Sequence, residues 1–360
     1  MAFLQFKNAR MAGIAAAVPK STVNNLHPSQ EDNISSDYSP TEFVEETGIN
    51  ERRISDTLTA SDLCFAAAER LISDLGWEKT EIEALVFVSQ MADYILPATA
   101  CILQDRLGLG THCYAEDIAL GCSGWIYGLS NVVSLMASGG IKKALLLAGD
   151  GCRREKGKHD PLFGYAGTAT AIVFDKDDEG FKFHFGTDGS GFDAIVVPDG
   201  GARNPITTKS FETEEINGRS FNRLQNRMKG LDVFSFGIST VPNSIKQLAN
   251  HYGFDYLSTD YLVLHQANKK MNDVIAMKLK LPQGKVPSSL RKFGNTSSAS
   301  IPLTIITELK GQFETKPTNF LCCGFGVGLS WGSVAFQTHN IIVSNLIELD
   351  DESFDHEHIV

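Results

Sequence analysis

Apolar and polar positions follow helical spacing in some segments of the chain and form short continuous runs in others. Residues 85–88 and 144–148 are uninterrupted apolar runs of strand length, typical of strands buried on both faces. A similar run at residues 11–18 predicts a first strand. Residues 122–138 place apolar side chains three, four and three positions apart before Gly139, which predicts an amphipathic helix. The first part of the chain therefore alternates strands and helices.

The second part of the chain repeats this order with little identity. Apolar runs at 261–264 and 320–323 predict two buried strands, and residues 330–336 predict a last strand. Residues 268–281 and 301–309 predict helices that lie between the first two of these strands. Because strands and helices alternate throughout, we predict an α/β fold built from two similar halves.

A charged turn marks the boundary between the halves. Four acidic residues and a glycine lie within residues 175–180, so we assign residues 1–180 to the first half and 181–340 to the second. Residues 341–360 form an acidic tail without Lys or Arg, and we expect its last dozen residues to be a solvated arm. Its segment Asp355-His356-Glu357-His358 offers metal-ligating side chains, but a free terminal run does not hold them in place, so a solvated run is favoured.

Composition narrows the class of protein. The 360 residues are 42% hydrophobic and 21% charged, as in ordinary globular proteins. A net charge of −11 makes the average surface repel nucleic acid and anionic membranes, so an acidic partner needs a local basic patch. Seven cysteines without a CxxC pair favour neither a disulfide framework nor a zinc site, which fits the cytoplasm. The N-terminal run is too short to span a membrane, and a strand is favoured over a signal peptide there.

Cys122 is the candidate nucleophile. It lies in Gly121-Cys122-Ser123-Gly124, between a short strand and the start of the predicted helix. Helix N-termini present unpaired N–H groups and positive partial charge, which lower the pKa of a thiol. A lone cysteine is more often a small buried apolar side chain. The two glycines favour the nucleophile, because they let a substrate approach the backbone closely.

Three further segments carry candidate chemistry in the second half. His265 directly follows a buried strand, where α/β proteins place functional side chains, although a structural hydrogen bond explains it equally well. Asn295 lies in a small polar segment that leads into a helix, and an ordinary turn is the alternative. The glycine-rich run 324–328 is either a tight hairpin or a set of backbone N–H donors for an oxyanion.

Together these segments resemble the thiolase superfamily and, within it, the β-ketoacyl-[acyl-carrier-protein] synthase III family. The resemblance runs from about residue 10 to residue 337, with the motifs in family order. These motifs are Thr47-Gly48-Ile49 with Arg52-Arg53-Ile54, Gly121-Cys122-Ser123-Gly124, His265-Gln266-Ala267-Asn268, Gly294-Asn295-Thr296-Ser297, and Gly324 to Gly332. The resemblance implies a thiolase-like fold of two pseudo-duplicated halves, layered α-β-α-β-α, and a homodimer.

The resemblance also implies a mechanism. Cys122 would take an acyl group from coenzyme A or a carrier protein, with the backbone N–H groups of Cys122 and Val327 as the oxyanion hole. Malonyl carrier protein would then lose CO₂, while His265 and Asn295 donate hydrogen bonds to its thioester oxygen. The enolate would attack the acyl group and give a 3-ketoacyl product. No metal or other cofactor is implied.

Further roles follow from the family pattern. Leu96 replaces an aromatic residue that shortens the acyl pocket from across the dimer, so Leu96 and Phe325 are expected to line a pocket that accepts more than acetyl groups. An acyl carrier protein is acidic and would dock on Lys269, Lys270 and Lys278. For each of these lysines the alternative is a solvated helix face.

Some positions depart from the family. Glu42 and a stretch around Lys158 match the positions that hold the adenine of coenzyme A, and Glu46 replaces a basic residue. An acidic entrance disfavours nucleotide phosphates, so we expect weak use of coenzyme A and delivery of the acyl group by a carrier protein. Tyr165 replaces the usual Asp, which nothing in the sequence explains, and Val327 replaces a glycine.

Two other functions stay open. A different reaction of the superfamily would transfer the acyl group to an alcohol, an amine or a non-malonyl acceptor, because function is only loosely tied to fold. An inactive partner subunit is the second alternative. It is less favoured, because Cys122, His265 and Asn295 are all present.

Overall fold

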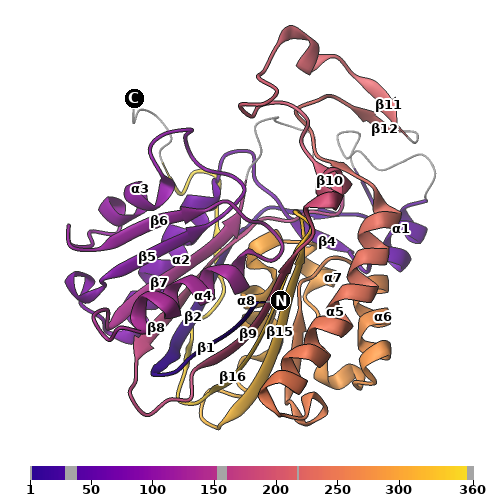
Figure 1. Cartoon of the computed structure of the whole chain (residues 1–360). Coiled ribbons are helices and arrows are strands. Elements are labelled where there is room, and N and C mark those ends of the chain that lie inside the picture. The colour runs from indigo at the N-terminus through magenta and orange to yellow at the C-terminus, as the bar shows by residue number, and fades with distance from the viewer. Residues whose placement is uncertain (1, 29–38, 152–159, 217–218, 355–360) are drawn as a thin grey trace.

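Two large β-sheets separated by a pair of helices form the framework of the molecule (Figure 1). The computed structural model describes residues 2–28, 39–151, 160–216 and 219–354, and all statements on structure refer to these. The strands of the first sheet are β2 (Ala9–Pro19), β5 (Ala84–Val88), β6 (Tyr114–Ile118), β7 (Lys143–Asp150), β8 (Ala166–Phe174), β17 (Ile342–Val343) and β18 (Ile347–Leu349). The strands of the second sheet are β1 (Ala2–Phe6), β9 (Phe181–Thr187), β14 (Tyr261–Leu264), β15 (Thr318–Gly326) and β16 (Ser330–Thr338).

Small ribbons and helices complete the described structure. The ribbons pair β3 (Thr22–Asn24) with β4 (Glu51–Arg53), β10 (Ile195–Val196) with β13 (Arg227–Met228), and β11 (Glu214–Ile216) with β12 (Arg219–Phe221). The helices are α1 (Pro40–Thr47), α2 (Ala60–Leu75), α3 (Thr99–Arg106), α4 (Gly124–Met136), α5 (Gly230–Tyr252), α6 (Lys269–Leu279), α7 (Leu290–Phe293) and α8 (Ser300–Leu309). Of these helices, none combines the length and the apolar character needed to cross a membrane.

Both sheets contain the same succession of strand directions. In the first sheet β2 and β8 are antiparallel, β8 and β7 are antiparallel, and β7 and β5 are parallel. In the second sheet β9 and β16 are antiparallel, β16 and β15 are antiparallel, and β15 and β14 are parallel. The predicted α/β fold with two similar halves is confirmed by this repeated order.

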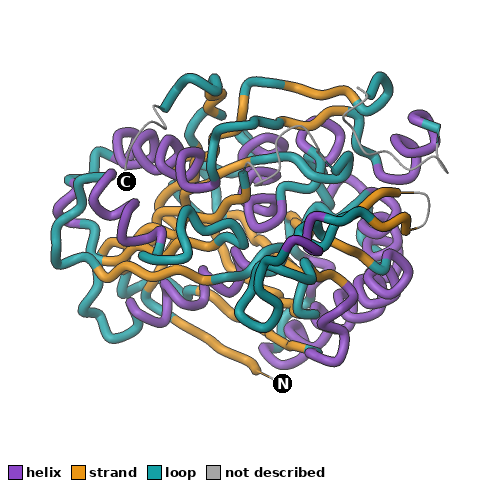
Figure 2. Tube along the Cα trace, turned by 90° about the horizontal axis from the view of Figure 1, so that it is seen from above, coloured by secondary structure: helices purple, strands orange, loops and turns teal. Residues whose placement is uncertain are grey.

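The helices occupy three layers around the two sheets. Helices α4 and α8 lie between the sheets, and their buried apolar residues join both sheets in one core. Because these helices are covered on both sides, most of their residues are buried. Helices α2 and α3 cover the outer face of the first sheet, and α5 and α6 cover that of the second. Seen from above, helices flank the strands on both sides (Figure 2). The layers therefore follow the predicted α-β-α-β-α order.

The chain crosses from one sheet to the other more than once. It leaves the first sheet after β8 and enters the second at β9, and the turn between them spans residues 175–180, where the sequence places the boundary. Strand β1, however, pairs with β9 in the second sheet, and β17 and β18 pair with β2 in the first. Each end of the chain thus completes the sheet of the opposite half.

The acidic tail is bound to the first half as far as Phe354. Strands β17 and β18 run parallel to β2, Glu348 forms an ion pair with Arg53 (2.8 Å), and Asp350 forms one with Lys20 (3.1 Å). The prediction that the last dozen residues form a solvated arm is wrong for residues 349–354, because Leu349 and Phe354 pack against the core of the first half. Acidic residues dominate the tail by number, but apolar residues alternate with them at strand spacing and reach the core. The segment Asp355-His356-Glu357-His358 lies outside the described residues.

Two helices differ from the sequence-based expectation. Helix α4 begins at Gly124, so Cys122 lies on the turn that precedes the helix. Helix α5 was not predicted, because Gly237 and Pro242 interrupt its pattern. It nevertheless forms along the second sheet, where its buried face adds to a core with α6.

The core contact of the tail can be tested with two neighbouring isoleucines. Ile341 is 3% exposed in the central core, whereas Ile342 is 40% exposed. We expect Ile341→Ala to lower the free energy of unfolding by about 2–5 kcal/mol, because it leaves a cavity. The control Ile342→Ala should cost about 1 kcal/mol or less. Denaturant unfolding measures both values, and equal losses would contradict the docking of the tail.

Candidate active site

Cys122 lies on a tight turn between β6 and α4. The N–H of Gly124 donates to the carbonyl of Gly121 (2.7 Å), which closes the turn, and the cysteine keeps part of its surface exposed. The hairpin between β15 and β16 approaches from the other half. A Cβ on Gly326 would lie 2.7 Å from Cβ and 2.8 Å from Sγ of Cys122, and Gly326 has a φ of +157°. Only glycine allows the backbone of the hairpin to come this close to the thiol.

Two backbone N–H groups point at the sulfur of Cys122. They belong to Val327 and to Cys122 itself, the two donors predicted for an oxyanion hole. Hydroxyl groups fix their relative position. Ser330 donates to the carbonyl of Val327 (2.7 Å), and its oxygen lies 2.7 Å from the hydroxyl oxygen of Ser123, the residue after the cysteine. The N–H of Cys122 from the first half and the N–H of Val327 from the second half are thus held as one pair of donors.

The environment of Cys122 favours the protonated thiol. Burial raises the pKa of Cys122 to about 11, although the backbone N–H groups of Val327 and Cys122 act in the opposite direction. The sequence predicts a lowered pKa from the helix N-terminus. The structure differs, because the cysteine precedes the first helical residue by two positions and desolvation of the thiolate dominates.

His265 is a buried, neutral imidazole at the end of β14. Its backbone N–H donates to the carbonyl of Cys323 (2.8 Å), and its Nδ1 lies 2.8 Å from the hydroxyl oxygen of Ser300. The ring packs edge-on against Phe325, with 5.6 Å between centroids. Burial lowers the pKa of His265 to about 3, so the side chain is uncharged at neutral pH.

Asn295 is held by a buried arginine and the loop that it anchors. The Arg52 guanidinium is buried and donates to the carbonyl of Phe163 (3.4 Å). The N–H of Asn295 donates to Leu162 (2.9 Å), and Gly164 donates to the carbonyl of Asn295 (3.1 Å). The family motif that contains Arg52 therefore acts at a distance, by holding the loop against which Asn295 is aligned.

Ser297 contacts all three candidate residues. Its hydroxyl faces the Cys122 thiol without a complete hydrogen bond, and its backbone carbonyl accepts a hydrogen bond from His265. Its backbone N–H donates to Oδ1 of Asn295 (2.9 Å), which leaves the Nδ2 amide as the group that Asn295 presents elsewhere. The thiol, the imidazole and the amide are thus brought together around one residue. Sequence reasoning missed this role, because the serine was only one member of a polar motif.

The lysines predicted for carrier docking all lie on α6 and have partners. Lys269 forms an ion pair with Asp273 (2.5 Å), and Lys270 forms one with Glu46 on α1 (2.6 Å). Lys278 donates to a backbone carbonyl of α5 (3.0 Å). The acidic Glu46 therefore does not stand alone at the entrance, because Lys270 neutralises it.

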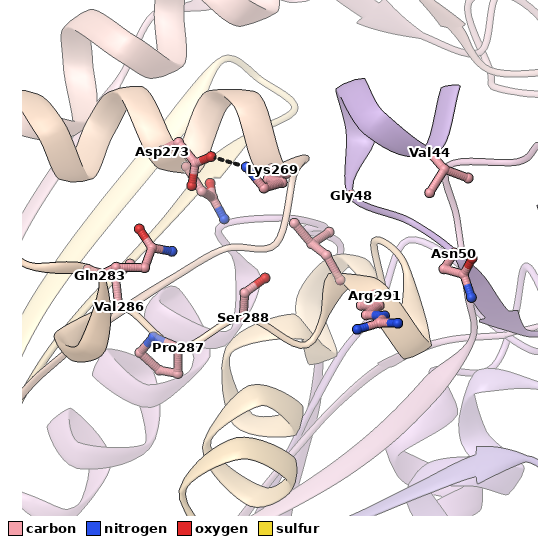
Figure 3. Close-up of a pocket in the computed structure, with 12 residues that line it drawn as sticks. Val44, Gly48, Asn50, Lys269, Asp273, Gln283, Val286, Pro287, Ser288 and Arg291 are labelled. Carbon is pink, nitrogen blue, oxygen red and sulfur yellow. Dashed lines mark hydrogen bonds and ion pairs between the residues drawn. The ribbon is translucent and has the colours of Figure 1, made fainter. Parts of the chain in front are cut away.

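A cavity of about 440 Å³ lies beside these lysines, between α1, α6 and the segment before α7 (Figure 3). It is lined by Val44, Gly48, Asn50, Lys269, Asn272, Asp273, Gln283, Val286, Pro287, Ser288, Leu290 and Arg291. None of the three candidate catalytic residues lines it. The reactive cluster and this cavity are therefore separate, and residues of both halves contribute to each.

The remaining predicted residues fall in different environments. Leu96 is 84% exposed on the loop between β5 and α3, so it lines no pocket within this one chain. Phe325 is buried against the imidazole, and Tyr165 is buried with its N–H donating to Arg53 (2.8 Å). Glu42, at a position matched to the coenzyme A site, caps the first turn of α1.

Lys158 lies outside the described residues. No three His, Cys, Asp or Glu side chains of the described segments gather as metal ligands would.

Comparison with known proteins gives the family. The family model for 3-oxoacyl-[acyl-carrier-protein] synthase III matches residues 116–189, and the model for its C-terminal part matches residues 251–338. A β-ketoacyl-[acyl-carrier-protein] synthase III of Rhodopirellula baltica is 32% identical over 357 residues, which cover 92% of this chain and 99% of that protein. The chain belongs to the β-ketoacyl-[acyl-carrier-protein] synthase III family. It is therefore an enzyme of the acyltransferase class.

Solved structures of synthase III proteins share the whole architecture. A 3-oxoacyl-(acyl-carrier protein) synthase of Burkholderia xenovorans has 36% identity and a TM-score of 0.88, covering 97% of this chain and 99% of its own. The synthase III of Pseudomonas aeruginosa has 28% identity and a TM-score of 0.77, with 93% and 99% covered. The predicted thiolase-type fold of this synthase III is confirmed by these likenesses.

The neutral state of His265 predicts a pH dependence of stability. Between the ordinary histidine pKa near 6.5 and the native value of about 3, the unfolded chain takes up a proton that the native protein does not. Stability is therefore lost as the pH falls below about 6.5. From pH 7 to pH 5 we expect wild type to lose about 2 kcal/mol more than His265→Asn, in urea unfolding at each pH.

The exposed His112 supplies the control for this measurement. His112→Asn should lose stability with falling pH as steeply as wild type. Parallel curves for wild type and His265→Asn would contradict a buried, neutral imidazole.

Proposed function

We propose that this synthase III carries out a decarboxylating Claisen condensation of an acyl group on Cys122 with malonyl carrier protein, which gives 3-ketoacyl carrier protein. One observation carries the proposal. The thiol, the imidazole and the amide, supplied by different halves of the chain, gather around Ser297: the thiol faces its hydroxyl, and the other two form hydrogen bonds with its backbone. A nucleophile next to two neutral hydrogen-bond donors is the set that this reaction requires.

The first step transfers the acyl group to the cysteine. The Cys122 sulfur attacks the carbonyl of the donor thioester, the C–S bond of the donor breaks, and the thiol proton passes to the departing sulfur. The raised pKa of the thiol means that the proton leaves during the attack. The N–H groups of Cys122 and Val327 point at the sulfur. They stabilise the negative charge that develops on the carbonyl oxygen of the acyl group next to it.

The second step makes the carbon nucleophile. The bond between CO₂ and the malonyl carbon breaks, and its electron pair becomes an enolate with negative charge on the thioester oxygen. With Ser300 donating to Nδ1, the neutral His265 carries its proton on Nε2. This N–H exchanges its hydrogen bond with the Ser297 carbonyl for one with the thioester oxygen, to which the Asn295 amide also donates a hydrogen bond. The enolate carbon then attacks acyl-Cys122, and the cysteine leaves as a thiolate. These steps need no metal or redox cofactor.

A carrier protein is the proposed acyl donor and acceptor partner. Glu42 places negative charge on the first turn of α1, which disfavours the phosphates of coenzyme A, whereas Glu46 is neutralised by Lys270. Lys269, Lys270 and Lys278 give α6 a row of cations beside it, and an acidic carrier protein can exchange the ion pairs of this row for its own.

The exposed loop between β5 and α3 supports a homodimer. Ile95 is 91% and Leu96 is 84% exposed, which leaves two large apolar side chains in water in a single chain. A second copy that covers this loop would bring Leu96 to the acyl pocket, next to the buried Phe325. A pocket bounded by leucine leaves room for acyl groups longer than acetyl.

Mass spectrometry of the intact protein tests the reaction. Incubation with acyl carrier protein thioesters should add the acyl mass to wild type, and Cys122→Ala should gain none because it lacks the nucleophile. The control Cys101→Ser changes an exposed cysteine on α3 and should acylate as wild type. His265→Ala and Asn295→Ala should still acylate but form 3-ketoacyl product about 10²–10³ times more slowly. If wild type is acylated but forms no 3-ketoacyl product when malonyl carrier protein is added, the proposed condensation is wrong.

The docking of the carrier protein can be tested through the ion pair between Lys270 and Glu46. Lys270→Glu should lower kcat/KM for carrier-protein substrates about tenfold at low salt, because it repels an acidic partner, while pantetheine thioesters should react as before. Glu46→Gln should raise kcat/KM severalfold, because it removes the charge that competes for Lys270. Lys176→Glu, in the turn between β8 and β9, serves as the control. A loss that is equal for both substrate types would contradict docking at α6.

A further inference from the structure

Two polar side chains meet beside the nucleophile turn. A Cβ on Gly121 would lie 2.3 Å from Oε1 and 2.7 Å from Cδ of Gln90, and 3.0 Å from Oγ of Ser297. Gln90 follows β5 in the first half, whereas Ser297 belongs to the second. The Gln90 carboxamide and the Ser297 hydroxyl thus lie close enough to bind the same small group. They meet at Gly121, the residue before Cys122 in the sequence. The condensation described above gives the carboxamide no role.

Ser297 is an unusual place for a serine. Its φ of +50° lies in the left-handed region that side chains other than glycine, asparagine and aspartate rarely adopt. The residue is only 6% exposed, and its hydroxyl has no hydrogen-bond partner among the described residues. A serine hydroxyl can donate one hydrogen bond and accept two. A buried polar group in this state gains from a ligand that completes its hydrogen bonds.

The backbone of Gln90 is fixed at the end of its strand. Its N–H donates to Oδ1 of Asp150 (3.3 Å), and the same carboxylate oxygen accepts from Ser89 (3.0 Å). This anchoring leaves the carboxamide directed at Gly121. A hydrocarbon chain packed against the carboxamide and the Ser297 hydroxyl would desolvate both without replacing their hydrogen bonds, which is costly.

A hydroxyl on the acyl group satisfies both partners at once. It can donate a hydrogen bond to one of the two side chains and accept one from the other. We propose that Gln90 and Ser297 form a polar subsite for a hydroxylated acyl group, so that the donor is a thioester with a hydroxyl on one of its first carbons. The proposal rests on the proposed function, because it requires an acyl group on Cys122.

Acyl donors that differ only in the hydroxyl test the subsite. The probes are butyryl, 2-hydroxybutyryl and 3-hydroxybutyryl carrier protein, and the readout is the rate of adduct formation on Cys122 by intact mass. In wild type we expect one of the hydroxylated donors to react about tenfold faster than butyryl. Gln90→Leu, of similar size but without hydrogen bonds, and Ser297→Ala should each reduce this ratio toward one. Gln283→Leu, at the separate cavity, should leave the ratio as in wild type.

The outcomes separate this subsite from the proposed function. Butyryl adducts that form as fast as both hydroxylated ones overturn the subsite and leave the condensation standing. Absence of any adduct in wild type overturns both. An unchanged ratio in Gln90→Leu overturns the role of the carboxamide, and circular dichroism establishes that each variant is folded. Should Gln90→Leu not fold, Ser297→Ala decides, because the same ratio is measured on the second partner.

Discussion

The site depends on the close approach of two backbones from opposite halves of the chain. The hairpin that contains Gly326 passes the Cys122 turn at a distance that leaves no room for a side chain. This contact is what aims the Val327 N–H at the sulfur, and the hydroxyls of Ser123 and Ser330 keep the two segments in register. Any shift of one sheet relative to the other would therefore separate donor from nucleophile. The two central helices, packed against both sheets, prevent that shift.

Contacts with neighbouring segments also fix the hydrogen-bond donors of the second half, His265 and Asn295. Asn295 is aligned by a loop of the first half, which is held by the buried Arg52, and His265 is fixed by its own strand and by Ser300. Ser297 joins these groups to the thiol in a left-handed backbone conformation. Much of the geometry of the proposed site is thus determined by residues to which the proposal assigns no chemical step. Their effect is to hold neutral groups in a dry environment, where hydrogen bonds to a developing charge are strong.

Some of this could be predicted from the sequence and some could not. Strand β14 was predicted to the residue, because Tyr261–Leu264 is a buried run bounded by polar residues. Cys122, His265 and Asn295 could be proposed as site residues because each lies near the end of a predicted element and within a motif that resembles the synthase III family. The pKa of the thiol and the ion pair of Lys270 with Glu46 could not be predicted, because they depend on burial and on neighbours far away in the sequence. The docked tail was missed because charge counts hid the alternation of its apolar residues.

The exchange of strands between the ends of the chain has a consequence for biosynthesis. Strand β2 is among the first segments to leave the ribosome, yet its partners β17 and β18 are made more than 300 residues later. One edge of the nucleophile-bearing sheet therefore stays unpaired for most of translation, and such an edge is a site for wrong pairing. Expressing the two halves as separate polypeptides would leave that edge permanently open, so the halves are similar in architecture without being independent in folding.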